Sequence, residues 1–433
     1  MVLGTDLTAA FIAEHGCTGY WTTFKAVRFY RQIVDVNDSK NIIEIDAPTR
    51  YFLKMRDNAR VYKVNPQLTE CGIEDLSIGN LQNNKSGWGD SDYDVAGTGA
   101  YEVHASHFIF FKNALNCWVR NVETYHPKEN TLDVHILSNC LKIADSRFVT
   151  VEHCNLQRPQ YEGDGGNGYL YTLEANDCLI KNCHAEHGRH NYDFKEMTSS
   201  GNVILKCSSK DPRLQSDFHM ALSMANLFDS FESEGDCIDA NFRPYGTTGD
   251  MHMYSTTQSV IWNTKGGIKG SGGNSNANLV VSRQYGQGYV VGTSGVVNGV
   301  LTSPISGTED GIPFNTGPID FVEGVGNGAT LLPQSLYEDQ FYKRIQRTTV
   351  IENATDKPVF LYYDFTTSLI ILKNMPNEEC TVILTNLSAI KCKSSTVNST
   401  TTQINVSTLP KGMYIVSCYS AIGKIFVGKI IKS

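Results

Sequence analysis

Short segments of similar character recur along this chain at intervals of 22 to 33 residues. A repeat of this length, with polar residues in one register, is typical of stacked coils that carry a polar stripe along one face. Such a stripe is suited to binding and cutting a long polymer; the alternative is a row of solvated or hydrogen-bonded surface residues. The segments are His107-Phe-Ile-Phe, Asn139-Cys-Leu-Lys, Gly168-Tyr-Leu-Tyr, His190-Asn-Tyr-Asp, His219-Met-Ala-Leu and His252-Met-Tyr-Ser.

Each repeat contains two short β-rich runs that are joined by a turn and followed by a polar loop. In the unit from Cys140 to Cys154, apolar residues alternate with polar ones, which is the period of a strand with one buried face. Short strands, this period and the lack of a long helical segment predict an all-β protein built as a parallel β-helix. A propeller would need blades of about 40 to 45 residues.

Cysteine placement supports the same architecture. Cys154, Cys183 and Cys207 each close a strand-like run, and Val122 closes the equivalent run of an earlier repeat. A position that accepts cysteine or valine is a core position, where a free thiol acts as a small hydrophobe. We therefore expect these three cysteines to be buried, reduced and aligned on successive coils.

We expect three regions along the chain. Residues 1–70 form an N-terminal cap with the first strands, in which residues 24–33 have helix-like spacing. Residues 71–347 form the coils, closed by a helix within residues 332–345. Residues 348–433 contain apolar β-rich runs that predict a small antiparallel β-sandwich.

Composition excludes several classes of protein. The net charge of −8 and the pI near 5.8 argue against nucleic-acid binding and against binding to anionic membranes. No apolar run approaches the roughly 20 residues of a membrane span. The first residues do not resemble a signal peptide, so we expect that the natural leader is missing. Nucleotide-binding and serine-hydrolase motifs are also absent from the sequence.

The C-terminal region carries the most family-specific pattern. Leu409-Pro-Lys-Gly-Met-Tyr414 is followed by a lysine-bearing final run, residues 423–432. This segment resembles the C-terminal sorting domain of type IX-secreted proteins of Bacteroidetes. The resemblance implies export, a secreted or cell-surface location and contact with secretion machinery, and it implies nothing about chemistry.

Residues 71–325 resemble the pectate-lyase-like superfamily of right-handed parallel β-helix proteins through their repeat architecture. The resemblance implies a right-handed coil and a carbohydrate-active protein with a polysaccharide or oligosaccharide partner. That superfamily contains lyases, hydrolases, epimerases and noncatalytic adhesins, so the fold alone does not select a reaction.

The segment Glu186-His-Gly-Arg-His190 favours a polysaccharide lyase. A lyase removes the proton beside a uronate carboxylate, which requires a base and a cation, and His187 or His190 fits the base while Arg189 fits the carboxylate clamp. A second polar ladder is expected at His104, His135, His187, Asp217 and Asp250. The predicted catalytic residues are His187, Arg189, His190, Asp217 and His219. The predicted substrate-binding residues are His104, His107, His135, Arg158, Tyr169, Asp193, Arg243, Tyr245 and His252.

Two other readings remain open. A glycoside hydrolase would need two carboxyl groups across the scissile bond. The candidates are Asp193, Asp211, Asp217 and Glu186, of which Asp193 and Asp217 lie near the histidine register. Asp193 alternates with Tyr192 and so is also able to point into the stack, which places hydrolysis second. A noncatalytic glycan-binding or adhesin protein is the third reading.

We expect no metal ion and no cofactor. The alternating carboxylates of residues 90–94 offer oxygen ligands for Ca²⁺, but they lack the glycine and distal glutamate of an EF-hand loop. A solvated acidic loop is the simpler interpretation. The pairs Asp217-Phe-His and Asp250-Met-His are more typical of mutual orientation than of metal ligation.

Overall fold

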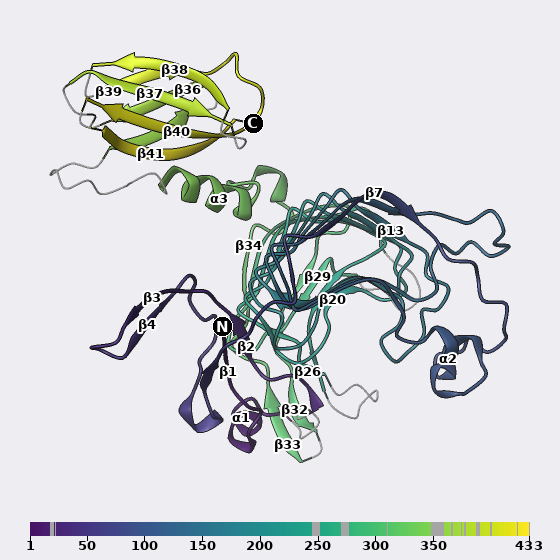
Figure 1. Cartoon of the computed structure of the whole chain (residues 1–433). Coiled ribbons are helices and arrows are strands. Elements are labelled where there is room, and N and C mark those ends of the chain that lie inside the picture. The colour runs from purple at the N-terminus through teal and green to yellow at the C-terminus, as the bar shows by residue number, and fades with distance from the viewer. Residues whose placement is uncertain are drawn as a thin grey trace. The chain divides into compact units, whose positions relative to one another are not determined.

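The computed structural model describes most of the chain (Figure 1). By its internal contacts the chain divides into two units, Met1–Ser335 and Leu336–Ser433. The described residues are 1–17, 21, 23–244, 252–269, 277–309, 311–347, 359–364, 367–373, 375, 378–386, 390–398, 401–421 and 423–432.

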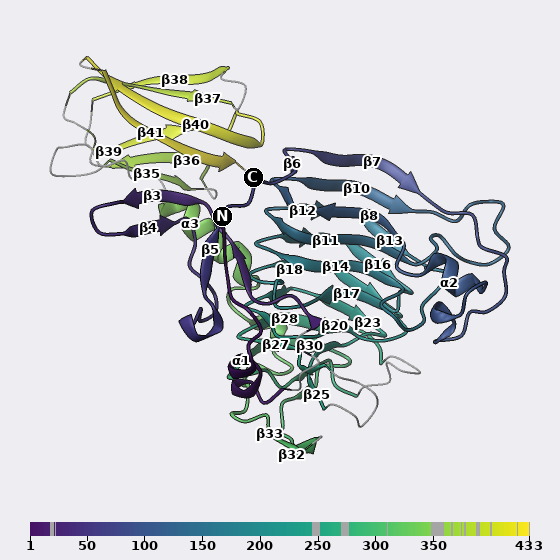
Figure 2. The same ribbon diagram turned by 60° about the horizontal axis from the view of Figure 1, so that its bottom comes forward.

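Two long parallel sheets make up most of the first unit, and the chain passes repeatedly from one to the other (Figure 2). The 13-stranded sheet contains β7 (Gly72–Ile78), β10 (Trp118–Thr124), β12 (Thr150–Glu152), β13 (Asn155–Gln157), β15 (Leu179–Lys181), β16 (His184–Glu186), β18 (Val203–Leu205), β19 (Ser208–Lys210), β22 (Leu227–Asp229), β23 (Glu232–Glu234), β28 (Val260–Gly266), β30 (Tyr289–Gly295) and β34 (Phe321–Glu323). The 10-stranded sheet contains β6 (Leu68–Thr69), β8 (His107–Lys112), β9 (Ala114–Leu115), β11 (Asn139–Arg147), β14 (Tyr169–Asn176), β17 (His190–Phe194), β20 (Ser216–Phe218), β24 (Ile238–Ala240), β29 (Val280–Ser282) and β31 (Val300–Leu301).

One hydrophobic core lies between the two sheets. Ile180 of β15 and Ile204 of β18 contribute to it from one sheet, and Phe194 of β17 and Phe218 of β20 from the other. The rings of Phe194 and Phe218 lie 5.1 Å apart on adjacent strands. Burying each such side chain stabilises the fold by about 1.5–3 kcal/mol, so repeated pairs of this kind hold the strands in register.

The expected cysteine stack is confirmed. Cys154, Cys183 and Cys207 are buried and free, and they align on successive strands because Asn155 pairs with His184, which pairs with Ser208. Asparagines fill a second aligned position at a turn between the sheets. There Asn202 Oδ1 accepts from the Cys178 amide at 2.9 Å, and Asn226 Oδ1 accepts from the Asn202 amide at 3.0 Å.

The N-terminal region differs from the expectation of a helix at residues 24–33. The chain is extended there, and residues 28–30 form β2, because Phe29 inserts into a core that also contains Phe11 and Trp21. Tertiary packing therefore overrides the helix-like spacing. The other described helices of this unit are α1 (Ala9–Glu14), α2 (Gly99–Val103) and the 3-10 helices η2 (Met55–Asp57), η3 (Asp92–Asp94) and η5 (Gly328–Thr330). The other strands form the sheet of β1 (Val2–Gly4), β2 (Arg28–Tyr30) and β5 (Arg60–Tyr62), and the pairs β3 (Ile33–Asn37) with β4 (Ile42–Ile45), β21 (Ser223–Met224) with β27 (Thr256–Thr257), β25 (Phe242–Arg243) with β26 (Met253–Tyr254), and β32 (Ser306–Glu309) with β33 (Ile312–Asn315).

The second unit contains antiparallel strands, as the sequence predicts. A three-stranded and a four-stranded sheet share one core, to which Leu372 and Val382 contribute from different sheets. Among the described residues, no helix is long and apolar enough to cross a membrane. The elements are α3 (Leu336–Arg347), β35 (Phe360–Asp364), β36 (Leu369–Lys373) and β39 (Thr401–Asn405), then β37 (Cys380–Thr385), β38 (Lys391–Val397), β40 (Gly412–Ser420) and β41 (Gly423–Lys432).

Two polar contacts organise the sorting-type motif of this unit. The hydroxyl of Tyr414 donates to the Pro410 carbonyl at 2.7 Å, and Lys432 Nζ donates to the Ser407 carbonyl at 2.7 Å. The tyrosine of the motif and the lysine of the last strand thus hold the same turn.

Candidate functional site

Three aspartates occupy one register on adjacent strands of the 10-stranded sheet. Asp193 of β17 pairs with Asp217 of β20, which pairs with Asp239 of β24. Figure 2 shows β14, β17 and β20 side by side. Adjacent strands lie about 4.8 Å apart, so side chains on the same face of neighbouring strands are in reach of one another. Since Tyr192 belongs to the core, strand alternation places Asp193 on the opposite, outward face.

The predicted histidine stripe is only partly correct. His107 pairs with Asn139 as expected, but Tyr169 rather than Gly168 stands opposite His190. His219 lies one residue beyond β20, whose Phe218 pairs with Phe194, so its register is that of Lys195. His252 precedes β26, a strand of a short antiparallel pair outside the long sheets. The second ladder is wrong as well, because the partners of Asp217 are aspartates.

These strands nevertheless bring most of the predicted residues together. We call the group the Asp/His cluster; it consists of Tyr169, Arg189, His190, Asp193, Lys195, Asp217, His219, Asp239, Arg243 and His252. Sequence reasoning missed Lys195 and Asp239. Asp193, Asp217 and Asp239 follow one another at 24 and 22 residues, so a search for recurring carboxylates would have found Asp239.

Asp193 is the most unusual member of the cluster. Its side chain is 0% exposed, and neither carboxyl oxygen has a hydrogen-bond partner among the described residues. Burial raises the pKa of Asp193 well above its ordinary value, and the charge of Asp217 raises it further. A buried carboxyl group without partners costs stability, so its presence is typical of a site that serves a ligand or a reaction.

The two oxygens of Asp217 have different surroundings, and Oδ1 lies 3.5 Å from His190 Nδ1. Its Oδ2 accepts from Arg243 Nη2 at 2.9 Å and lies 3.0 Å from His219 Nδ1. Its Oδ1 is buried and has no hydrogen-bond partner in the described part of the chain. The Arg243 guanidinium also donates to Asp239 Oδ2 at 3.0 Å, so one cation bridges two carboxylates of the ladder.

His190 is held as a neutral imidazole. Its Nδ1 lies 2.6 Å from the carbonyl oxygen of Gln215 and must donate to it, because a carbonyl oxygen only accepts. The lone pair of the neutral ring is therefore on Nε2, which is buried and unpartnered among the described atoms. Burial lowers the pKa of His190 well below its usual value, and the charge of Asp217 only partly opposes this effect.

Tyr169 connects the two histidines. Its ring stacks on His190 with 4.8 Å between centroids, and its hydroxyl lies 3.0 Å from His219 Nε2. Arg189 Nη1 donates to the same hydroxyl at 3.4 Å, and Lys195 Nζ lies 5.1 Å from the ring centre. Burial raises the pKa of Tyr169 and lowers that of His219, so the pair is a protonated phenol beside a neutral imidazole.

His187 and Arg158 belong to a different group. His187 Nε2 lies 3.1 Å from Glu186 Oε1, and Arg158 bridges Glu186 and Asp133 at 3.0 and 2.6 Å. His187 stands in the turn after β16 of the 13-stranded sheet, whereas His190 opens β17 of the 10-stranded sheet. His187 and His190 therefore lie in different surroundings, although they are only three positions apart in the sequence.

The other predicted residues make local contacts. His104 lies 3.0 Å from Asn167 Nδ2, His107 lies 2.8 Å from the Ala105 carbonyl, and His135 lies 3.1 Å from the Thr124 hydroxyl. Arg213 binds both oxygens of Asp90 in the acidic segment considered for Ca²⁺, at 2.7 and 2.8 Å. Tyr245 and Asp250 lie outside the described residues.

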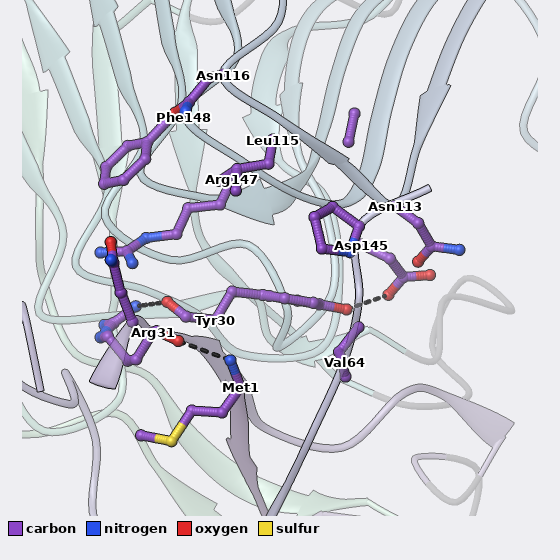
Figure 3. A pocket seen from close by; sticks show the side chains of 13 residues that line it. Met1, Tyr30, Arg31, Val64, Asn113, Leu115, Asn116, Asp145, Arg147 and Phe148 are labelled. Carbon is purple, nitrogen blue, oxygen red and sulfur yellow. Dashed lines mark hydrogen bonds between the residues drawn. The ribbon is translucent and has the colours of Figure 1, made fainter. Parts of the chain in front are cut away.

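A cavity of about 400 Å³ lies elsewhere in the first unit, between the N-terminal strands and the ends of β9 and β11 (Figure 3). The Tyr30 hydroxyl donates to Asp145 there at 3.2 Å, and the Met1 amine donates to the Arg31 carbonyl at 2.8 Å. Arg147 forms ion pairs of 2.6 and 2.7 Å with two further carboxylates. The charged groups of this cavity are thus engaged with protein partners, unlike Asp193.

Comparisons with known proteins identify the C-terminal part of the chain. No curated protein matches it. One similar solved structure is a DUF3244-family protein with an immunoglobulin-like β-sandwich from Bacteroides vulgatus. The match is 18% identical and covers 20% of this chain and 97% of that protein. Its TM-score of 0.18 is too low to carry an argument. The family model of the secretion system C-terminal sorting domain matches residues 366–433. The chain therefore ends in a type IX sorting tail, and the protein is exported to the cell surface or exterior.

Proposed function

We propose that the protein is an exported enzyme that hydrolyses a polysaccharide at the Asp/His cluster. The observation that carries the proposal is the Asp193 carboxyl group, which is fully buried, has no hydrogen-bond partner among the described residues and pairs in register with Asp217. Two carboxyl groups in different surroundings are what glycoside hydrolysis requires.

The two aspartates suit different roles. Asp193, whose oxygens have no hydrogen-bond partner among the described residues, would donate a proton to the leaving glycosidic oxygen. Asp217 binds Arg243 through Oδ2, and its Oδ1 has no hydrogen-bond partner among the described residues, so in this proposal Asp217 activates the water. Asp193 shares the outward register of Asp217, which supports hydrolysis over the alternative that Asp193 points into the stack.

β-Elimination is the second candidate, and the contacts of Tyr169 favour it. A neutral His219 beside the Tyr169 hydroxyl offers a proton acceptor next to a proton donor, at 3.0 Å. Arg189 at 3.4 Å from the same hydroxyl supplies a cation for a uronate carboxylate. A uronic acid polymer would therefore suit this end of the cluster.

We also propose that the two long sheets are faces of a right-handed parallel β-helix, as the resemblance to the pectate-lyase-like superfamily implies. The alternation of the chain between the sheets and the parallel pairing of successive strands support this architecture. Its regular strand spacing of about 4.8 Å would let several coils contact one extended glycan.

A panel of neutral and uronate-containing polysaccharides tests the reaction. The full chain is incubated with each glycan, and both reducing ends and near-ultraviolet absorbance are recorded. Hydrolysis predicts new reducing ends without absorbance, whereas elimination predicts both, because it leaves an unsaturated sugar. Binding of a glycan without either product would overturn the enzymatic proposal in favour of a binding or adhesin protein.

A further inference from the structure

We infer that His190, Asp217 and His219 form a binding site for one divalent transition-metal ion. One nitrogen from each imidazole and one oxygen from the carboxylate lie within 4.8 Å of one another, and all three side chains are buried. The three ligands lie close together because His190 and Asp217 belong to the adjacent strands β17 and β20, and His219 follows β20 directly. Two imidazoles and a carboxylate are a common ligand set for Zn²⁺ and Fe²⁺.

The free atoms of the ligands point to a missing partner. His190 uses Nδ1 to donate to the Gln215 carbonyl at 2.6 Å, which leaves the Nε2 lone pair buried and unpartnered within the described chain. Metal-binding histidines are usually oriented in this way, with the second ring nitrogen donating to a carbonyl or carboxylate. Oδ1 of Asp217 is also buried without a partner among the described atoms.

The third ligand is already held by groups that orient it. His219 Nδ1 lies 3.0 Å from Asp217 Oδ2, and the Tyr169 hydroxyl lies 3.0 Å from His219 Nε2. An ion shared by His219 and Asp217 therefore binds Nδ1 and takes the place of this direct contact, while Nε2 keeps its contact with the Tyr169 hydroxyl. The Tyr169 hydroxyl orients the ring and is not one of the ligands.

Charges of both signs surround the site, and the cations of Lys195, Arg243 and Arg189 act on His219. Asp193 and Asp239 flank Asp217 on the two neighbouring strands, while Arg243 bridges Asp217 and Asp239. The Asp193 oxygens, unpartnered in the described structure, offer a further carboxylate beside the site. Imidazole ligands favour transition metals, whereas Ca²⁺ and Mg²⁺ prefer sites made of oxygen atoms.

Three protein ligands leave coordination positions open, as in catalytic zinc sites. Metal coordination lowers the pKa of bound water, so the ion, with Asp217 as one of its ligands, would supply the activated water. The metal site rests on the geometry of its ligands alone, and only its use in catalysis rests on the proposed function.

Metal titration of the full chain tests the inference. The protein is stripped with a chelator and titrated with Co²⁺, followed by its visible absorption, and with Zn²⁺, followed by calorimetry. We expect one ion per chain, with affinity reduced at least roughly 10- to 100-fold in His190→Ala and Asp217→Asn. Tyr169→Phe keeps all three ligands and removes only the hydroxyl that orients His219, so its affinity should fall less than that of either ligand variant.

His153→Asn is the matched control, since His153 is exposed and lies at a left-handed backbone position that asparagine accepts. It should bind Co²⁺ like the parent. Absence of stoichiometric binding by the parent, or equal binding by a folded Asp217→Asn variant, would overturn the inference. If the protein binds the metal but cleaves no glycan, the inferred metal site stands and the proposed function is overturned. If the protein cleaves a glycan but binds no metal, the metal site is overturned and the proposed function stands.

Discussion

Replacing Cys183 by serine should destabilise the first unit through a single buried atom. Cys183 is 3% exposed in the aligned cysteine stack, and its Sγ lies 3.3 Å from the Lys181 carbonyl oxygen. A serine hydroxyl at this position loses its water, and the nearest acceptors are the carbonyls of Lys181 and Val151, which lie 3.3 and 3.8 Å from Sγ of the cysteine. Burying such a hydroxyl costs about 1–3 kcal/mol, so the free energy of unfolding should fall by that amount.

Cys71 provides the matched control because its thiol makes the same local contact but is exposed. Its Sγ lies 3.2 Å from the Thr69 carbonyl, two residues earlier, as in Cys183. Urea denaturation followed by circular dichroism should therefore show Cys71→Ser within about 0.5 kcal/mol of the parent. Equal loss in both variants, or no loss in Cys183→Ser, would refute the assignment of the stack to the core.

Three further predictions concern other parts of the chain. Burial lowers the pKa of His15 from 6.5 to about 4, so the unfolded chain takes up a proton at this residue first as the pH falls. The free energy of unfolding should therefore drop by up to about 3 kcal/mol between pH 6.5 and pH 4. Thermal melts across this range should show the drop in the parent and not in His15→Gln. Arg147→Lys should lower the free energy of unfolding by about 1–3 kcal/mol, because one ammonium group cannot form ion pairs with both Asp46 and Asp177 in the way the guanidinium does. An unchanged midpoint of urea denaturation would contradict this. Deleting residues 348–433 should abolish export while leaving cleavage of a soluble oligosaccharide intact, and loss of activity in a folded deletion would argue against this division.

The strand pattern and the cysteine stack could be predicted because both depend on local alternation. Each cysteine closes a run whose apolar residues face one way, so its burial follows from the sequence alone. The helix expected at residues 24–33 was wrong because Phe29 packs into a core formed with distant residues. Spacing along the chain does not report such contacts.

The composition of the cluster was largely predictable, whereas its register was not. Gly168 has a positive φ of 76° and ends a turn, so pairing starts at Tyr169, one residue later than the repeat suggested. His187 and His190 are neighbours in sequence but stand at the ends of strands in different sheets. Strand register and the course of a turn depend on pairing with the next coil, which the sequence of one coil does not specify.

The cleavage rate of Asp193→Asn on the glycan found by the panel tests the central claim most directly. The account predicts a loss of roughly 10²- to 10⁴-fold, because an amide cannot donate the proton that the leaving oxygen needs. Glu232→Gln removes an exposed carboxylate from the 13-stranded sheet and should cleave at the parental rate. A folded Asp193→Asn variant with full activity would contradict the claim that the Asp/His cluster is the active site.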